Sequence, residues 1–203
     1  MSVAGASSGS GATPWRPTPA QIAAAENATV PDVIAPGLHL LFVGINPGLY
    51  SGAVGHHFAR PGNRFWRVLH AAGITDQVLS PFEERELLSI GVGITNLVDR
   101  ATATADRLGT DELRGGARRL ERKVRRSMPT AVAFLGLSAY RTAFERPSAP
   151  VGRQEDRIAG VAVWLLPNPS GLNAHYQLPE LTELFRRAWS AAAGERSGSG
   201  PNR

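Results

Sequence analysis

Two short apolar segments, each followed at once by a loop that contains an Asn-Pro pair, constrain this chain more than any other feature. The segments are residues 38–43 and 161–166, and the loops after them read Gly44-Ile45-Asn46-Pro47-Gly48 and Pro167-Asn168-Pro169-Ser170-Gly171. Apolar runs of this length are typical of buried strands. A loop at the carboxyl end of a strand is where open α/β sheets place their ligand sites.

Each proline keeps the preceding asparagine extended, which leaves the amide side chain free to form hydrogen bonds. A single Asn-Pro pair is usually an ordinary turn. Two pairs in matched positions, each with glycine close by, favour the alternative that both loops border one neutral, hydrogen-bonding pocket.

Strands alternate with helices through the rest of the folded region. Two further strands are expected at residues 91–98 and 131–135. Hydrophobic spacing and capping signals predict helices over residues 63–72, 80–90, 110–127, 138–145 and 179–192. This alternation predicts an α/β fold of three α/β/α layers, with a central, mostly parallel, four-stranded sheet.

The two ends of the chain differ from its middle in composition. Residues 1–17 and 194–203 are dominated by small residues, proline and polar residues, and we expect both to be disordered tails. Residues 18–193 are then a single domain, which opens with a short helix capped by Thr18. We expect a monomer.

Arginine accounts for 21 of the 22 basic residues, because Lys123 is the only lysine, and the formal net charge is +5. Arginine suits a phosphate-bearing partner, although genomic base composition explains the excess equally well. The absence of cysteine excludes disulfides, Cys-ligated zinc, Fe–S clusters and thiol nucleophiles. No apolar run is long enough to span a membrane and no secretory signal is visible, so we expect a cytoplasmic protein.

The first Asn-Pro loop contains groups that could act on a nucleobase. Asn46 cannot serve as a base, but it can hold a water molecule for attack where the leaving group departs largely unaided, as an electron-poor pyrimidine does from its sugar. Phe58 could form an aromatic floor under that base, or belong to the core. Arg60, Asn63 and Arg64 surround the start of the next helix, where backbone N–H groups favour a phosphate.

In the second loop, Asn168 and Ser170 can bind a phosphate or the edge of a base. Leu172, which follows Gly171, either enters a base stack as an apolar wedge or packs back against its own protein. Adjacent histidines, His56 and His57, have no further ligands at a suitable spacing, so we expect no metal and no cofactor.

Other conspicuous side chains are expected to be structural. Asp99 is expected to pair with Arg100 or another arginine. The basic residues of the helix at 110–127 are expected to be mostly solvated, with DNA-backbone contacts for some of them as the alternative. Three tryptophans are expected in the core: Trp66, Trp164 and Trp189.

Four segments together resemble a known family. They are Gly44–Leu49, Phe58–Trp66, Leu97–Arg100 and Pro167–Leu172. From about Pro36 to Ala192, the chain resembles the mismatch-specific uracil-DNA glycosylases, bacterial relatives of thymine-DNA glycosylase in the uracil-DNA glycosylase superfamily. The resemblance implies that superfamily's fold.

The resemblance also implies roles for individual residues. Asn46 would position the hydrolytic water, and Phe58 would stack on the flipped base. The backbone around Ile45 and Gly48 would read the base edge, Asn168 would help to hold the site, and Gly171 and Leu172 would enter the duplex. With the chemistry above, the candidate set is Asn46 as the catalytic residue, Ile45, Gly48, Ser51, Phe58 and Asn168 as base-binding residues, and Arg60, Asn63, Arg64, Ser170, Gly171, Leu172 and Asn173 as DNA-binding residues.

The chain departs from the family pattern at several positions. Asn173 and Ala174 stand where the family has Ser and Arg, and Arg60 stands where His is expected. His56 and His57 precede Phe58, where apolar residues or proline are more usual. No carboxylate accompanies Asn46 in the first loop, so we predict slow chemistry.

These features predict a monofunctional DNA N-glycosylase. It would flip uracil or a related damaged pyrimidine out of double-stranded DNA, preferably from a mispair with guanine, and hydrolyse its N-glycosidic bond. Neither loop contains a lysine for strand cleavage through a Schiff base. Two alternatives remain open: a glycosylase for hypoxanthine or xanthine, and a non-catalytic α/β protein that binds nucleotides or DNA.

Overall fold

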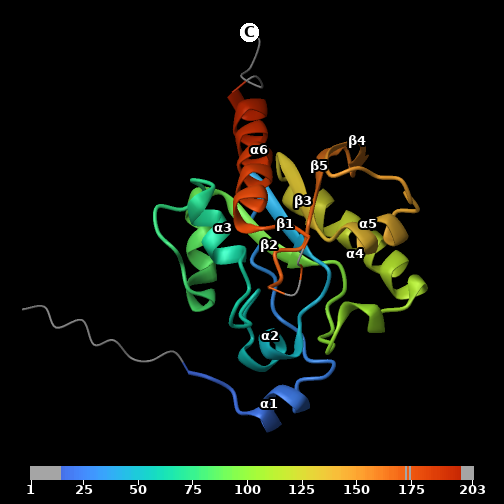
Figure 1. Ribbon diagram of the computed structural model, residues 1–203. Coiled ribbons are helices and arrows are strands. Elements are labelled where there is room, and N and C mark those ends of the chain that lie inside the picture. Colours follow the sequence, from blue (N-terminus) through green and yellow to red (C-terminus); the bar gives the residue numbers. More distant parts are fainter. Residues whose placement is uncertain (1–14, 172, 174, 198–203) are drawn as a thin grey trace, which may run out of the picture.

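The computed structural model describes residues 15–171, 173 and 175–197. Its centre is a five-stranded sheet in the order β2-β1-β3-β5-β4 (Figure 1). The bounds of the strands are β1 Leu40–Gly44, β2 Val92–Asn96, β3 Ala131–Leu135, β4 Gly152–Ile158 and β5 Val161–Leu166. The first three and β5 run parallel, and β4 pairs with β5 in the antiparallel direction.

The sheet confirms the α/β prediction but has one strand more than the four expected. The missed strand, β4, has the sequence GRQEDRI and lies at the edge of the sheet with most of its residues exposed or half-buried. An edge strand needs neither an apolar run nor a continuous apolar face, because only its backbone must pair. Hydrophobic pattern therefore does not reveal it.

Two layers of helices cover the sheet (Figure 1). Helices α3 (Phe65–Ala71) and α6 (Leu178–Ser197) pack on one face, where Phe42, Phe65 and Phe185 contact one another. Helices α4 (Thr110–Ser127) and α5 (Leu137–Ala143) pack on the other face, around Leu120, Phe134 and Tyr140. These two apolar clusters hold the three layers together.

The remaining helices are short. They are α1 (Pro19–Ala24), α2 (Leu49–Val54) and the 3₁₀ helices η1 (Pro81–Ile90) and η2 (Ala105–Arg107). Thr18 caps α1 as expected and also forms a capping box with Gln21. The capping signal at Ser80 is present too, as a box with Glu83, but it opens a 3₁₀ helix. Helix α6 continues to Ser197, so residues 194–197, assigned above to a C-terminal tail, are helical. The rest of that tail and residues 1–14 lie outside the described residues.

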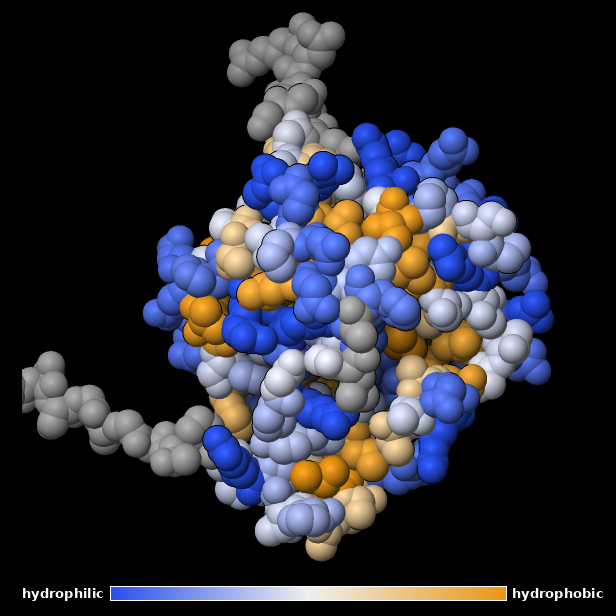
Figure 2. Space-filling view, in the orientation of Figure 1, coloured by the Kyte–Doolittle hydropathy of each residue, from blue (hydrophilic) through white to orange (hydrophobic). Residues whose placement is uncertain are grey.

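Core placement of the tryptophans is confirmed: Trp66 is buried, and Trp164 and Trp189 are partly buried against the same apolar cluster. Among the described residues, no helix is long and apolar enough to cross a membrane. The face shown in Figure 2 is mostly hydrophilic, with apolar residues in separate patches. It therefore offers no single broad apolar surface.

The strand order places a ligand crevice at the edge of the sheet formed by the carboxyl ends of its parallel strands. From β1 the chain passes to β2, which lies on one side of β1, and then crosses to β3, which lies on the other side of β1. Loops that leave β1 and β3 therefore diverge at their carboxyl ends, which is where open α/β sheets bind ligands. Because β5 runs parallel to β3, the loop after β5 opens at this same edge.

Candidate active site

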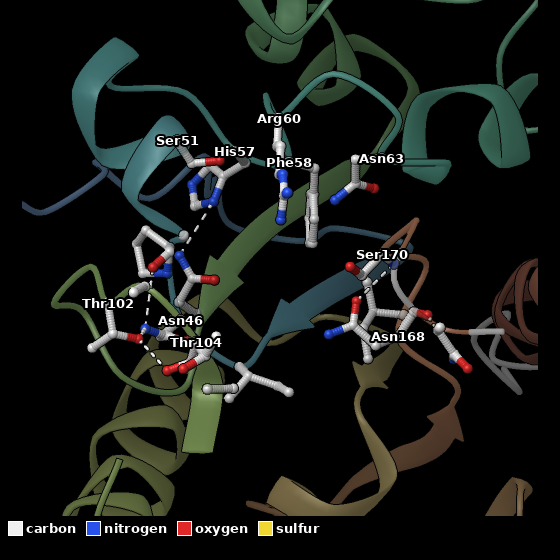
Figure 3. A pocket seen from close by; sticks show the side chains of 18 residues that line it. Asn46, Ser51, His57, Phe58, Arg60, Asn63, Thr102, Thr104, Asn168 and Ser170 are labelled. Carbon is white, nitrogen blue, oxygen red and sulfur yellow. Dashed lines mark hydrogen bonds between the residues drawn. The ribbon is translucent and has the colours of Figure 1, made fainter. Parts of the chain in front are cut away.

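A cavity of about 380 Å³ lies at this edge and brings the two Asn-Pro loops together (Figure 3). The loop after β1 and the loop after β5 form opposite walls, and Leu135, at the end of β3, lies between them. The cavity is lined by Ile45, Asn46, Pro47, Gly48, Ser51, His57, Phe58, Arg60, Asn63, Asn96, Thr102, Ala103, Thr104, Ala105, Leu135, Asn168, Ser170 and Asn173.

Ten of the thirteen candidate residues line this cavity: Ile45, Asn46, Gly48, Ser51, Phe58, Arg60, Asn63, Asn168, Ser170 and Asn173. Gly171 lies beside it, in a groove shared with Arg60 and Gly62. A β-carbon on Gly171 would come within 2.7 Å of the Gly62 carbonyl oxygen, so the second Asn-Pro loop lies against the segment between Phe58 and α3. Leu172 and Ala174 lie outside the described residues.

The carboxamide of Asn46 is held in one orientation. Its Nδ2 lies 3.1 Å from the carbonyl oxygens of Pro47 and Arg100 and 2.7 Å from Thr102 Oγ1. Carbonyl oxygens only accept hydrogen bonds, so the NH2 group must face them. The amide oxygen, Oδ1, is thereby left as an acceptor at the cavity, where it can bind a water molecule.

Thr102 fixes which end of the Asn46 amide faces it. Nothing in the sequence indicated this role for Thr102. Its side chain is buried, and its hydroxyl donates to the carbonyl oxygen of Thr104 at 2.8 Å. Because the single hydroxyl proton is used there, Thr102 can only accept from Asn46. Thr102 reaches Asn46 across 56 residues of sequence, so no local motif connects the two.

Replacing Thr102 by valine should slow base release in single-turnover assays by about tenfold, the value of one hydrogen bond. The near-equal volume of valine should keep DNA affinity unchanged. Thr142→Val, on the remote helix α5, is the matched control and should react like the wild type. A Thr102→Val rate equal to that of the control would show that Asn46 does not depend on this hydroxyl.

Phe58 forms an aromatic wall of the cavity. One face of its ring stacks on Phe65, with 4.1 Å between ring centroids and 23° between ring planes, and the ring also borders the cavity. Its backbone is left-handed, with φ of 52°. Phe58 was expected either to lie under a base or to belong to the core. In the structure it packs on the core and also borders the cavity.

Asn96 and His57 are a second pair of cavity side chains that orient each other through a hydrogen bond. The sequence did not indicate this pairing. His57 is buried, and its Nε2 lies 3.0 Å from the Pro31 carbonyl, to which it must donate. Nδ1 of the neutral ring then accepts from Asn96 Nδ2 at 3.4 Å. The Asn96 oxygen approaches Gly44 so closely that a β-carbon there would lie 2.5 Å from it.

Burial lowers the pKa of His57 below its ordinary value of 6.5, against the opposing effect of Glu84. The unfolded chain therefore binds more protons than the folded chain at pH values just below 6.5, and stability is lost as the pH falls through this range. His57→Gln should lose less unfolding free energy between pH 7 and pH 5 than the wild type in urea titrations. Equal losses would contradict a buried, neutral His57.

Arg64 was predicted to bind DNA, but its hydrogen-bond donors are used within the protein. Its side chain is buried and donates to four carbonyl oxygens of the second loop and its continuation. Nε and the two terminal nitrogens bond Pro169 at 3.3 Å, Tyr176 at 2.5 Å, Ser170 at 2.7 Å and Asn173 at 2.9 Å. Arg64 thus fixes the second loop against the start of α3 rather than binding a phosphate.

Three other predicted polar residues hold the loops and still border the cavity. Asn168 Oδ1 accepts from the Ser170 N–H, and Asn63 Oδ1 accepts from the Phe65 N–H. Both amides therefore keep Nδ2 as a donor. Ser51 Oγ accepts from the Ala59 N–H and closes the loop that carries Phe58.

Several charged residues outside the cavity are paired. Asp99 lies 3.0 Å from Lys123 and 3.7 Å from Arg119, so the expected arginine pairing is confirmed with a lysine in addition. On α4, Arg114 pairs with Glu145 and Arg125 with Glu121. His56 pairs with Glu84, and no group of three potential metal ligands occurs in the part of the chain described.

Two comparisons with known proteins bear on the family and the fold. Residues 31–193 match the family model described as the uracil DNA glycosylase superfamily. A solution NMR structure of a candidate uracil DNA glycosylase from Methanosarcina acetivorans is similar, with a TM-score of 0.53 and 22% sequence identity. The match covers 80% of this chain and 98% of the other, and it supports the fold.

Proposed function

The chain belongs to the uracil DNA glycosylase superfamily, whose members act on DNA as glycosidic hydrolases, and we propose that it is a monofunctional glycosylase for uracil opposite guanine. The observation that carries this proposal is the fixed orientation of Asn46. Hydrogen bonds to Pro47, Arg100 and Thr102 leave its amide oxygen free to direct a water molecule into the cavity.

In this mechanism, the target nucleotide rotates out of the duplex and its base enters the cavity. The Phe58 ring stacks on the base, and the oriented amides provide both acceptors and donors for the base edge. Asn46 Oδ1 holds water against C1′ of the sugar. An amide does not remove a full proton from water near neutral pH. The glycosidic bond therefore breaks largely before water attacks C1′, and the reaction is slow.

A preference for mispairs follows from the cost of flipping. Extruding a base from a stable pair costs a few kcal/mol of free energy, and extruding a mispaired base costs less. The groove that includes Asn63, Ser170 and Gly171 lies next to the cavity mouth and suits the backbone of the distorted strand. We propose that residues 18–193, with the last turn of α6 to Ser197, act as one domain and as a monomer on double-stranded DNA.

A panel of oligonucleotides, scored for abasic sites after alkali, tests this proposal. Substrates are duplexes with G·U, A·U, G·T, ethenocytosine or hypoxanthine, and single-stranded DNA with uracil. We expect release from G·U to be fastest, without strand cleavage before alkali. Faster release of hypoxanthine would favour a purine substrate, and DNA binding without any base release would favour a non-catalytic binding protein.

A further inference from the structure

Arg60 is the cavity residue that the water-directing mechanism does not use. Its side chain points into the cavity beside the Phe58 ring (Figure 3). It is exposed, and it makes no ion pair with the residues that the structure describes. Its guanidinium therefore keeps its hydrogen-bond donors for a ligand.

The other lining residues leave this charge without compensation. Within the described part of the chain, the cavity wall contains amides, hydroxyls, apolar groups and His57, but neither Asp nor Glu. His57 adds no charge near neutral pH, because burial lowers its pKa below 6.5. Arg60 thus makes the cavity positive, which favours an anion or a group that becomes negative during reaction.

Breaking a glycosidic bond produces such a group. The C1′–N1 bond breaks and its electron pair leaves with the base, so the sugar becomes positive and the base negative. The negative charge spreads over the carbonyl oxygens O2 and O4. Water then bonds to C1′ and gives up a proton, while the base takes up a proton and leaves as neutral uracil. A carboxylate would stabilise the sugar, but a guanidinium can stabilise only the base.

We propose that Arg60 is a further catalytic residue, whose guanidinium stabilises the negative charge on the departing base. This inference rests on the proposed function. The planar set of N–H donors in arginine suits the oxygens of a flat anion. Bound DNA would cover the cavity mouth and exclude water, which strengthens the interaction between these charges.

The test varies the leaving group. Arg60→Met, Arg60→Lys and the wild type are compared on G·U and G·5-fluorouracil duplexes in single turnovers at saturating enzyme. 5-Fluorouracil is the more acidic base and needs less help to depart. Arg60→Met should slow release of uracil by tenfold or more, on the order of an oxyanion-hole donor, and release of 5-fluorouracil by less than about threefold. Arg60→Lys, which keeps the charge, should recover part of the loss.

Arg126→Met is the matched control, because Arg126 is exposed in the last turn of α4, at the opposite edge of the sheet. It should leave both rates unchanged. Equal losses for the two bases in Arg60→Met, or a loss in DNA affinity alone with a weaker salt dependence, would assign Arg60 to a phosphate and overturn the inference. If the wild type releases neither base, the proposed function itself fails.

Discussion

Asn46→Ala will release uracil from a G·U duplex at least about 100-fold more slowly than the wild type, as expected for loss of one preorganised polar group. The substitution removes the amide oxygen that directs water, while the cavity walls and the Phe58 ring remain. DNA affinity should therefore change little. The measurement is single-turnover release of base at saturating enzyme, together with the dissociation constant for the same duplex.

Asn46→Asp separates orientation from charge. Aspartate has no NH2 group to donate to the Pro47 and Arg100 carbonyls, so it cannot adopt the wild-type arrangement without repelling them. We expect it to be nearly as slow as Asn46→Ala near neutral pH. Wild-type rates in either variant would contradict the assignment of Asn46.

Arg64→Met will lower the free energy of unfolding by about 3 kcal/mol, because several carbonyl oxygens lose a charged donor at once. The bonds that Arg64 makes to the second loop also set the position of Asn168, so base release should fall along with stability. Urea unfolding measures the first effect. Lysine should not rescue the variant, since one ammonium group cannot reproduce the planar set of donors.

Arg67→Met is the control for this prediction. Arg67 lies in α3, three residues after Arg64, which is the N-cap residue of that helix, and Arg67 is exposed. Removing its charge should leave the unfolding free energy within about 0.5 kcal/mol of the wild type, as for most surface substitutions. An Arg64→Met protein as stable as this control would show that the second loop is held by other contacts.

Much of the fold could be predicted from the sequence, because the four parallel strands are buried and therefore consist mostly of apolar residues. The edge strand β4 was missed for the opposite reason: its exposed side chains are polar, and its pairing depends on backbone atoms. The extension of α6 to Ser197 was also missed, since its last turns contain Gly194 and polar residues that resemble a tail.

The candidate site was predicted where its residues are contiguous in sequence. Both Asn-Pro loops follow strands of one sheet, and topology alone brings Asn46 and Asn168 to one edge. Thr102 and Asn96 were missed because their contribution is an orientation, which depends on hydrogen bonds across the fold. Arg64 was misassigned because the sequence does not distinguish an arginine that meets phosphate from one that meets backbone carbonyls.

The proposed role of Asn46, to hold water against C1′ of a flipped nucleotide, is tested most directly by a crystal structure with bound DNA. The DNA is a G·U duplex whose target sugar carries a 2′-fluoro group, which slows bond breaking. We predict the uracil stacked on Phe58, and a water molecule within hydrogen-bond distance of Asn46 Oδ1 and in line with C1′. A base bound away from this cavity, or an Asn46 side chain turned away from the sugar, would contradict this role of Asn46.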